Sequence, residues 1–130
     1  MYHWFRLKRE DDLKKEIETY VINHNISGVV LSCVGCLGKI KLRLADGKSV
    51  VEKIGQYEIV SITGTLSVDG VHIHLSVSDE SGITLGGHLK DGCLVNTTAE
   101  ICLLEITELK FNRKFDKNTG YKELVTKQIS

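Results

Sequence analysis

The chain has no proline among its 130 residues and no excess charge of either sign. Without proline, every position can donate its backbone N–H to a neighbouring strand, so no segment is excluded from the interior of a sheet. The 17 basic residues balance 17 acidic ones, which leaves no overall field that would draw a polyanion to the surface. The composition therefore argues against strong binding of DNA by this chain alone.

Long hydrophobic runs are also missing. No apolar stretch approaches the roughly 18 residues that span a membrane, and residues 1–8 lack the apolar core of a signal peptide. We therefore expect one soluble, cytoplasmic domain with no membrane partner. In that compartment the four cysteines are expected to be reduced. Cys33 and Cys36 have the spacing of a metal or redox pair, but no second such pair follows, which favours small core residues.

The most regular part of the sequence is residues 64–89. From residue 71 to residue 78 apolar and polar residues alternate, as in a strand with one buried face. This alternation places His72 and His74 together on the polar face.

A dipeptide that favours a tight turn precedes this strand. Asp69 and Gly70 both tolerate the positive φ that a two-residue type I′ turn requires. Such a turn would set Ser67 opposite His72 in the preceding strand.

A second turn follows the strand. A three-residue loop that ends at Gly82, with this glycine in the left-handed conformation, would pair His74 with His88. A four-residue loop would instead turn His88 to the opposite face. Gly86 and Gly87 are expected at a bend or at a close approach between strands.

With the three-residue loop, His72, His74 and His88 would form a cluster on one sheet face. Imidazole suits Zn²⁺, and three imidazoles leave a fourth coordination position for water or another ligand. Zinc is therefore the predicted cofactor, and Asp79 or Glu100 would be a further ligand or a general base if either reached it. The alternative is a polar sheet face on which the histidines bond to neighbouring hydroxyl groups.

The N-terminal segment is expected to contain a strand and a helix. Residues 2–8 alternate as a strand, with Trp4 in the core and His3 at the surface without a partner. The acidic residues 10–12 begin one amphipathic helix, and His24 lies near its end, where the helix terminus is negative.

Two strands and a connection are expected next. Residues 29–34 form a strand that is apolar on both faces. In the following strand, Lys39, Lys41 and Arg43 alternate with apolar residues and form a basic face. An ordinary solvated face is the favoured interpretation, and contact with nucleic-acid phosphates is the alternative. Residues 50–56 are a short strand or an irregular connection.

The last strand is apolar on both faces between residues 99 and 106. A small sheet does not easily cover both faces from one chain, so this pattern indicates self-association. Residues 110–130 are polar, with a turn at residues 118–120, and are expected to lie over the surface or to be partly disordered.

The order of several motifs resembles the PPC (plants and prokaryotes conserved) domain family, also called DUF296. These motifs are KIKLRL, GTLS, HIHLSVSD and GGHL, followed by a tail with Arg113, Asp116, Thr119, Gly120 and Leu124. The resemblance covers nearly the whole chain. It implies an α+β domain with a largely antiparallel β-sheet and one main flanking helix, assembled as a homotrimer. It also implies that stand-alone prokaryotic members keep three histidines, here His72, His74 and His88, some of them with a bound metal.

The resemblance leaves two classes of function open. In plant members the domain accompanies a proline-containing AT-hook, which this chain cannot contain because it has no proline. The first class is a trimeric regulatory interaction module, associated with DNA or with another regulatory protein. The alternative is a metal-dependent small-molecule-binding protein or a hydrolytic enzyme that uses the three histidines. A purely structural metal would instead need a fourth ligand from the protein.

Overall fold

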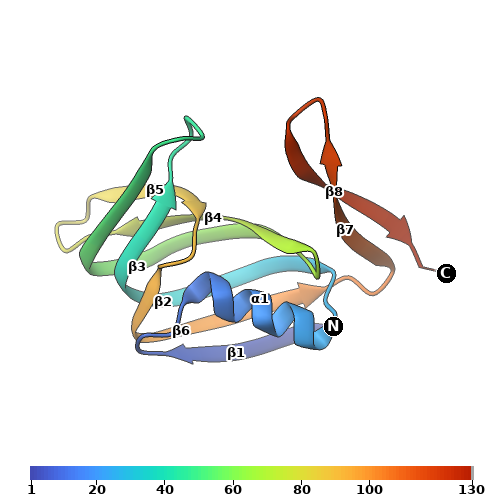
Figure 1. The fold of residues 1–130 in the computed structure, drawn as a ribbon. Coiled ribbons are helices and arrows are strands. Elements are labelled where there is room, and N and C mark those ends of the chain that lie inside the picture. Colours follow the sequence, from blue (N-terminus) through green and yellow to red (C-terminus); the bar gives the residue numbers. More distant parts are fainter. Residues whose placement is uncertain (130) are drawn as a thin grey trace.

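The computed structural model describes residues 1–129 and contains one helix and eight strands (Figure 1). In chain order these are β1 (Tyr2–Lys8), α1 (Leu13–His24), β2 (Gly28–Arg43), β3 (Val50–Ser67), β4 (Gly70–Ser78), β5 (Thr84–Leu89), β6 (Leu94–Glu105), β7 (Leu109–Asp116) and β8 (Tyr121–Gln128). Six strands form an antiparallel sheet in the order β1-β6-β2-β3-β4-β5, and β7 and β8 form a separate hairpin. The predicted α+β class with one flanking helix is confirmed. Within residues 1–129, no helix has the length and apolar character that crossing a membrane requires.

The helix α1 begins and ends at residues that suit its termini. The Asp12 carboxylate accepts a hydrogen bond from the Lys15 N–H at 3.1 Å, and Asn25 ends the helix with φ of 51°. One stripe of the helix is fully buried against the sheet, and it consists of Leu13, Ile17 and Val21. The predicted helix and its buried face are confirmed.

The position of α1 decides which side chains of β1 are buried. The Phe5 ring stacks on Tyr20 of the helix, with 4.3 Å between ring centroids, and His3 points the same way. Trp4 points to the other face and is 64% exposed. The predictions of a buried Trp4 and of a surface His3 without a partner are therefore wrong. Alternation separates two faces of a strand, but it does not say which face a helix covers.

The strands β2 and β3 are longer than the sequence pattern indicated. Residues 50–56 belong to β3 and are not an irregular connection. β2 continues through Gly35, where a β-carbon would lie 2.2 Å from the Thr98 carbonyl oxygen of β6. At its end β2 also pairs with β5, where Arg43 lies opposite His88. This pairing closes that part of the sheet on itself and brings Arg43 beside a predicted site residue.

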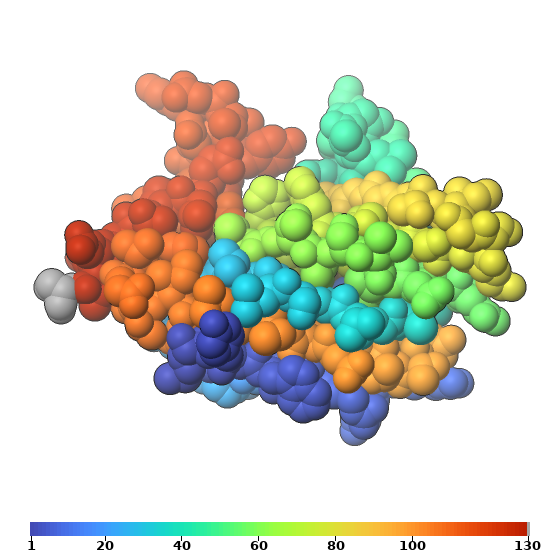
Figure 2. Space-filling view, turned by 180° about the vertical axis from the view of Figure 1, so that it is seen from behind, coloured from blue at the N-terminus to red at the C-terminus, as the bar shows by residue number. Residues whose placement is uncertain are grey.

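The sheet face opposite α1 is open to solvent, as the view from behind shows (Figure 2). Directly opposed residues of antiparallel strands point to the same side, and one such row consists of Tyr2, Leu104, Val29, Thr65 and His72. Tyr2 and Val34 are 75% and 60% exposed. Apolar side chains therefore lie on both faces of this sheet, as the sequence indicated.

The hairpin of β7 and β8 stands away from the sheet (Figure 1). It is anchored at its base, where Phe111 is 5% exposed and its N–H donates to the Ser27 hydroxyl at 2.8 Å. Residues 110–130 were expected to lie over the surface or to be partly disordered; residues 110–128 instead belong to this ordered hairpin, and Ser130 lies outside the described residues. The predicted turn at residues 118–120 forms the hairpin tip, where Gly120 has φ of 79°. The segment is polar because neither face of a protruding hairpin is covered.

Candidate metal centre

The turn between β3 and β4 differs from the predicted one. Asp69 does not adopt a positive φ, so Asp69 and Gly70 are not the central pair of a type I′ turn, and the turn lies one residue earlier. The Ser67 hydroxyl stabilises it by accepting from the Asp69 N–H at 3.2 Å and donating to the Gly70 carbonyl at 3.0 Å. His72 consequently lies opposite Thr65 instead of Ser67. This partner is two residues away from the predicted one, so His72 stays on the predicted face.

The loop between β4 and β5 agrees with the three-residue prediction. Gly82 has φ of 81°, and the Asp79 N–H donates to the Ile83 carbonyl at 2.9 Å, which leaves residues 80–82 between them. His74 therefore lies opposite His88, as predicted.

The two glycines of β5 lie where strands approach closely. A β-carbon at Gly86 would lie 2.8 Å from the Leu75 carbonyl oxygen, and one at Gly87 would lie 2.5 Å from the Arg43 carbonyl oxygen. Side chains are therefore excluded at both positions. Their absence lets β5 fit between β4 and the end of β2, which positions His88.

The side chains of His72, His74 and His88 converge on one side of the sheet. We call them the three-histidine cluster. Each offers one ring nitrogen, and these nitrogens lie within 4.8 Å of one another. The ring centroids are 5.0, 5.5 and 5.7 Å apart. Nδ1 of His88 is buried and has no hydrogen-bond partner among residues 1–129. Three nitrogen donors and an unbonded buried nitrogen fit a metal ion, so the cluster could hold one.

The surroundings of the cluster favour neutral imidazoles. Burial, together with the positive charge of Arg43, lowers the pKa of His88 to about 4. Burial also lowers the pKa of His72, with the charges of His74 and Arg113 adding to the effect and Glu123 opposing it. Because a metal binds the neutral ring, these shifts favour the ligating form of His72 and His88.

A cavity of about 500 Å³ lies beside the cluster. Its walls come from His72 and His88 of the cluster, from the β3–β4 turn and from two arms. The arms are the turn between β2 and β3 and the β7–β8 hairpin, which rise side by side in Figure 2. The polar lining includes His72, His88, Arg43, Arg113, Lys122 and Glu123. We call this space the arm cavity.

The two carboxylates considered from the sequence lie elsewhere. The Asp79 carboxylate accepts from the N–H groups of Ser81 and Ile83 at 2.8 and 3.0 Å, and so stabilises its own loop. Glu100 is an exposed residue of β6. Neither belongs to the three-histidine cluster or lines the arm cavity. The carboxylates in the cavity lining are Asp69 and Glu123. The sequence pattern did not indicate Glu123 as a site residue, because residues 110–130 were expected to lie over the surface or to be partly disordered; the turn before it was the available signal.

The basic residues of β2 do not form one surface. Nζ of Lys39 and Nζ of Lys41 lie 3.1 and 3.9 Å from the carboxylate of Glu52. Arg43 instead lines the arm cavity, and its Nε is buried without a hydrogen-bond partner among the described residues. The three basic residues therefore have two different environments. The two lysines share one carboxylate, and the arginine lies at the candidate site.

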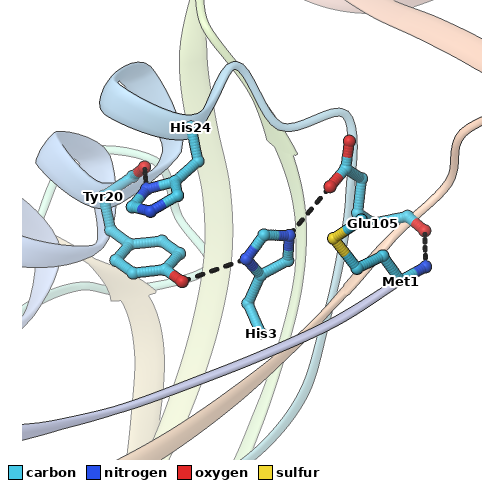
Figure 3. Close-up of polar contacts among 5 residues, drawn as sticks. All are labelled: Met1, His3, Tyr20, His24 and Glu105. Carbon is cyan, nitrogen blue, oxygen red and sulfur yellow. Dashed lines mark hydrogen bonds and ion pairs between the residues drawn. The ribbon is translucent and has the colours of Figure 1, made fainter.

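The remaining two histidines belong to a separate group at α1, which we call the His3 network (Figure 3). Nδ1 of His3 lies 3.0 Å from the Tyr20 hydroxyl, and Nε2 lies 2.8 Å from the Glu105 carboxylate. The His24 ring donates from Nδ1 to the Tyr20 carbonyl at 2.9 Å. Both ring nitrogens of His3 are thus bonded.

The four cysteines are free, in agreement with the expected reduced state. Burial raises the pKa of Cys33 to about 12 and that of Cys93 to about 11. Both thiols are therefore protonated at neutral pH and are poor metal ligands.

The chain is similar in sequence to one protein family and to two curated proteins. The sequence model of the Plants and Prokaryotes Conserved (PCC) domain matches residues 2–107. The chain is 44% identical over 126 residues to the Bifunctional protein GlmU of Synechococcus sp. (strain JA-3-3Ab), and 46% identical over 120 residues to that of strain JA-2-3B'a(2-13). These matches cover 96% and 92% of this chain but 20% and 19% of the relatives. The chain thus spans about a fifth of the length of the curated relatives it matches.

Three solved structures share the fold across nearly the whole chain. A hypothetical protein from Salmonella cholerae-suis superposes with a TM-score of 0.94 at 32% identity, covering 98% of this chain and 94% of that one. A plant- and prokaryote-conserved (PPC) protein from Pyrococcus horikoshii gives 0.76 at 32% identity, with 94% and 90% covered. A metal-containing protein from Archaeoglobus fulgidus gives 0.79 at 25% identity, with 96% and 93% covered.

Proposed function

The chain belongs to the Plants and Prokaryotes Conserved domain family, abbreviated PCC or PPC, and from this premise we propose that it is a zinc-binding module that receives a small molecule in the arm cavity. His72, His74 and His88 are the ligands in this proposal. The observation that carries it is the convergence of three imidazoles, with ligand nitrogens within 4.8 Å of one another, two of which, His72 and His88, line a cavity.

Zinc is proposed because of the chemistry of the donor set. Three neutral imidazoles suit Zn²⁺, and a site with three protein ligands keeps one position for water or substrate. Zinc bound there would supply a Lewis acid toward an oxygen of the bound molecule. The similarity to the metal-containing protein from Archaeoglobus fulgidus supports the presence of a metal.

The first test is metal content per chain. Untagged wild-type protein, purified without added metal, is compared with His88→Ala and with the control His24→Ala. We expect about one equivalent of zinc in the wild type and the control and little in His88→Ala, because two remaining imidazoles bind zinc weakly. Absence of zinc from the wild type, even after zinc is offered, would contradict the proposal and would mean that the histidines form an ordinary polar sheet face.

Removal of the metal separates an open site from a structural one. With an open site, a chelator removes the zinc while the fold and the assembly persist. If chelation unfolds or dissociates the protein, the metal is structural and the small-molecule proposal is wrong.

We further propose that the chain assembles as a homotrimer through the open sheet face. The family resemblance supports this, and so do Tyr2 and Trp4, which are 75% and 64% exposed on that face. Trp4→Glu should weaken the assembly, whereas Ile83→Glu should not, because Ile83 is equally exposed but lies in the loop between β4 and β5. Light scattering after size exclusion measures both variants. A monomeric wild type would contradict the proposal.

Association with DNA, or with a regulatory protein in the cytoplasm, is the family-based alternative. The zero net charge and the shared Glu52 of Lys39 and Lys41 make DNA the weaker candidate. Retention on duplex DNA that falls steeply with added salt would support it, and no retention at low salt would remove it.

A further inference from the structure

The arm cavity has more positive than negative side chains in its lining. The lining includes Arg43, Arg113 and Lys122 as well as Asp69 and Glu123, which is three positive groups against two negative ones. Within residues 1–129, no carboxylate oxygen lies within 4.0 Å of the side-chain nitrogens of these three cations. The cavity therefore has positive charge that the described residues do not pair.

One of the two carboxylates already has partners. The Asp69 carboxylate accepts from the Arg113 backbone N–H at 3.0 Å and from the Asn112 side-chain amide at 2.9 Å. These hydrogen bonds, the backbone one first, lower the pKa of Asp69 and keep it ionised. Asp69 thus links the hairpin to the β3–β4 turn, and Glu123 is the other carboxylate in the lining.

The two arginines lie on either side of the three-histidine cluster. Arg43 is opposite His88, and its buried Nε has no partner among residues 1–129. The Arg113 guanidinium donates to the Thr65 hydroxyl at 2.6 Å, and Thr65 is opposite His72. A partly buried guanidinium without an anion is unfavourable, so an anion bound between these groups would be stabilised.

The remaining lining is apolar and aromatic. Tyr121, Val71 and Ala45 contribute to the wall. A β-carbon on Gly47 would lie 3.9 Å from the Tyr121 hydroxyl, so the two arms approach each other over the cavity. The volume of about 500 Å³ lies in the range of roughly 300–1,000 Å³ that small-molecule sites have.

We propose that the arm cavity binds a small organic oxyanion, a carboxylate or a phosphate monoester. Its charged end lies between Arg43, Arg113 and the three-histidine cluster, and its apolar part lies against Tyr121. The inference rests on the proposed zinc-binding function, because bound zinc would supply the positive charge at the histidines. The two arginines supply positive charge without any metal. Arginine is suited to this role because its planar fork binds carboxylate and phosphate oxygens in pairs.

Isothermal titration calorimetry with three probes tests the ligand class. Phenyl phosphate and benzoate share an aromatic body and differ in the oxyanion, and inorganic phosphate has no body. We expect saturable binding of phenyl phosphate or benzoate to zinc-loaded protein, tighter than that of inorganic phosphate. The better of the two aromatic probes identifies the oxyanion. Absence of saturable binding of all three at millimolar concentration overturns the proposal.

Two variants locate the binding site. Arg43→Gln should weaken the preferred aromatic probe at least about tenfold and leave the zinc content unchanged, because Arg43 is not a ligand of the metal. Lys39→Gln removes a charge from the same strand and should change neither quantity. Tyr121→Ala, at an exposed position of the hairpin, should weaken the aromatic probes about fivefold and leave inorganic phosphate unaffected. Wild-type affinity in both Arg43→Gln and Tyr121→Ala overturns the proposal.

The zinc content of the same samples separates this inference from the proposed function. If the wild type holds no zinc, the zinc-binding function fails, and the titrations are still decisive because the arginines are present in the metal-free chain. Saturable binding that Arg43→Gln weakens then supports an oxyanion site, and its absence overturns one. If the wild type holds zinc but binds none of the probes, the zinc site stands and the oxyanion proposal fails.

Discussion

The His3 network and the three-histidine cluster both contain histidines, but they differ in how far the ring nitrogens are hydrogen-bonded. In the His3 network, Glu105 and Tyr20 bond both ring nitrogens of His3 (Figure 3). In the cluster, the centroids of the three imidazoles are 5.0, 5.5 and 5.7 Å apart, and the buried Nδ1 of His88 has no hydrogen-bond partner within residues 1–129. Buried polar groups are normally satisfied by hydrogen bonds within the protein. The difference indicates that the hydrogen bonds of His3 stabilise the fold, whereas the cluster could hold a metal ion.

The two groups also differ in how the sequence brings them together. The ligand nitrogens of the cluster come from two neighbouring strands joined by a short loop. His3 and Glu105 are 102 residues apart and meet because β1 pairs with β6. Local turn geometry therefore assembles the candidate site, and tertiary packing assembles the structural network.

The largest expected difference is the response to zinc. With free zinc a thousandfold above its Kd, binding should stabilise the wild-type fold by about 4 kcal/mol. Thermal unfolding with and without zinc measures this, and His72→Ala should lose the effect while His3→Gln keeps it. An equal zinc response in His72→Ala would show that the metal binds elsewhere.

Removal of one histidine from each of the two groups should change the stability of the metal-free chain by different amounts. His3→Ala should lower the free energy of unfolding by about 1–3 kcal/mol, because it leaves the Glu105 carboxylate and the Tyr20 hydroxyl without a partner. His88→Ala should cost less, because among the described residues His88 Nδ1 has no hydrogen bond to lose. Chemical denaturation in the presence of a chelator measures both values. A greater loss in His88→Ala would reverse the comparison.

The pH dependence of the stability of the metal-free chain should reveal the contribution of His88. Burial lowers the pKa of His88 in the folded chain to about 4, against an ordinary value of 6.5 in the unfolded chain. Between these values the unfolded chain binds more protons, so this contribution to stability is complete above 6.5 and is lost as the pH falls toward 4. His88→Gln should flatten the stability profile in that window, and an unchanged profile would refute this assignment.

The smallest effect is expected at His24. Its ring is exposed and donates to the Tyr20 carbonyl in the last turn of α1. His24→Ala should cost about 0.3–1 kcal/mol, the usual value for a cation or donor at a helix C-terminus. Denaturation of this variant beside His3→Ala measures the difference, and an equal or larger loss at His24 would mean that the ring packing with Tyr20 matters more than the bond to Glu105.

Local patterns in the sequence predicted much of the candidate site. Alternation placed His72 and His74 on one face, and the positive φ required at Gly82 selected the loop that brings His88 to them. Even the incorrect turn at Asp69 left the histidines on the right face, because it shifted the partner strand by two residues.

The other residues of the site belong to segments whose position in the fold could not be predicted from local sequence patterns. Arg43 reaches the cavity because β2 pairs with β5 as well as with β3. Glu123 and Arg113 reach it because the β7–β8 hairpin is anchored at Phe111 and fastened to Asp69. These contacts join segments that are far apart in the chain, so nothing in their immediate neighbours indicates them.

The sequence by itself determined the strand alternation, the helix α1 with its buried stripe, and the left-handed conformation of Gly82. These features follow from the two-residue and 3.6-residue repeats of the backbone and from the φ values that each residue tolerates. Only the tertiary structure decided which face of β1 the helix covers, and hence that His3 is partly buried and Trp4 exposed. It also decided that two distant arms enclose the cavity beside the histidines. Such choices depend on the packing free energy of the whole domain, to which residues throughout the chain contribute.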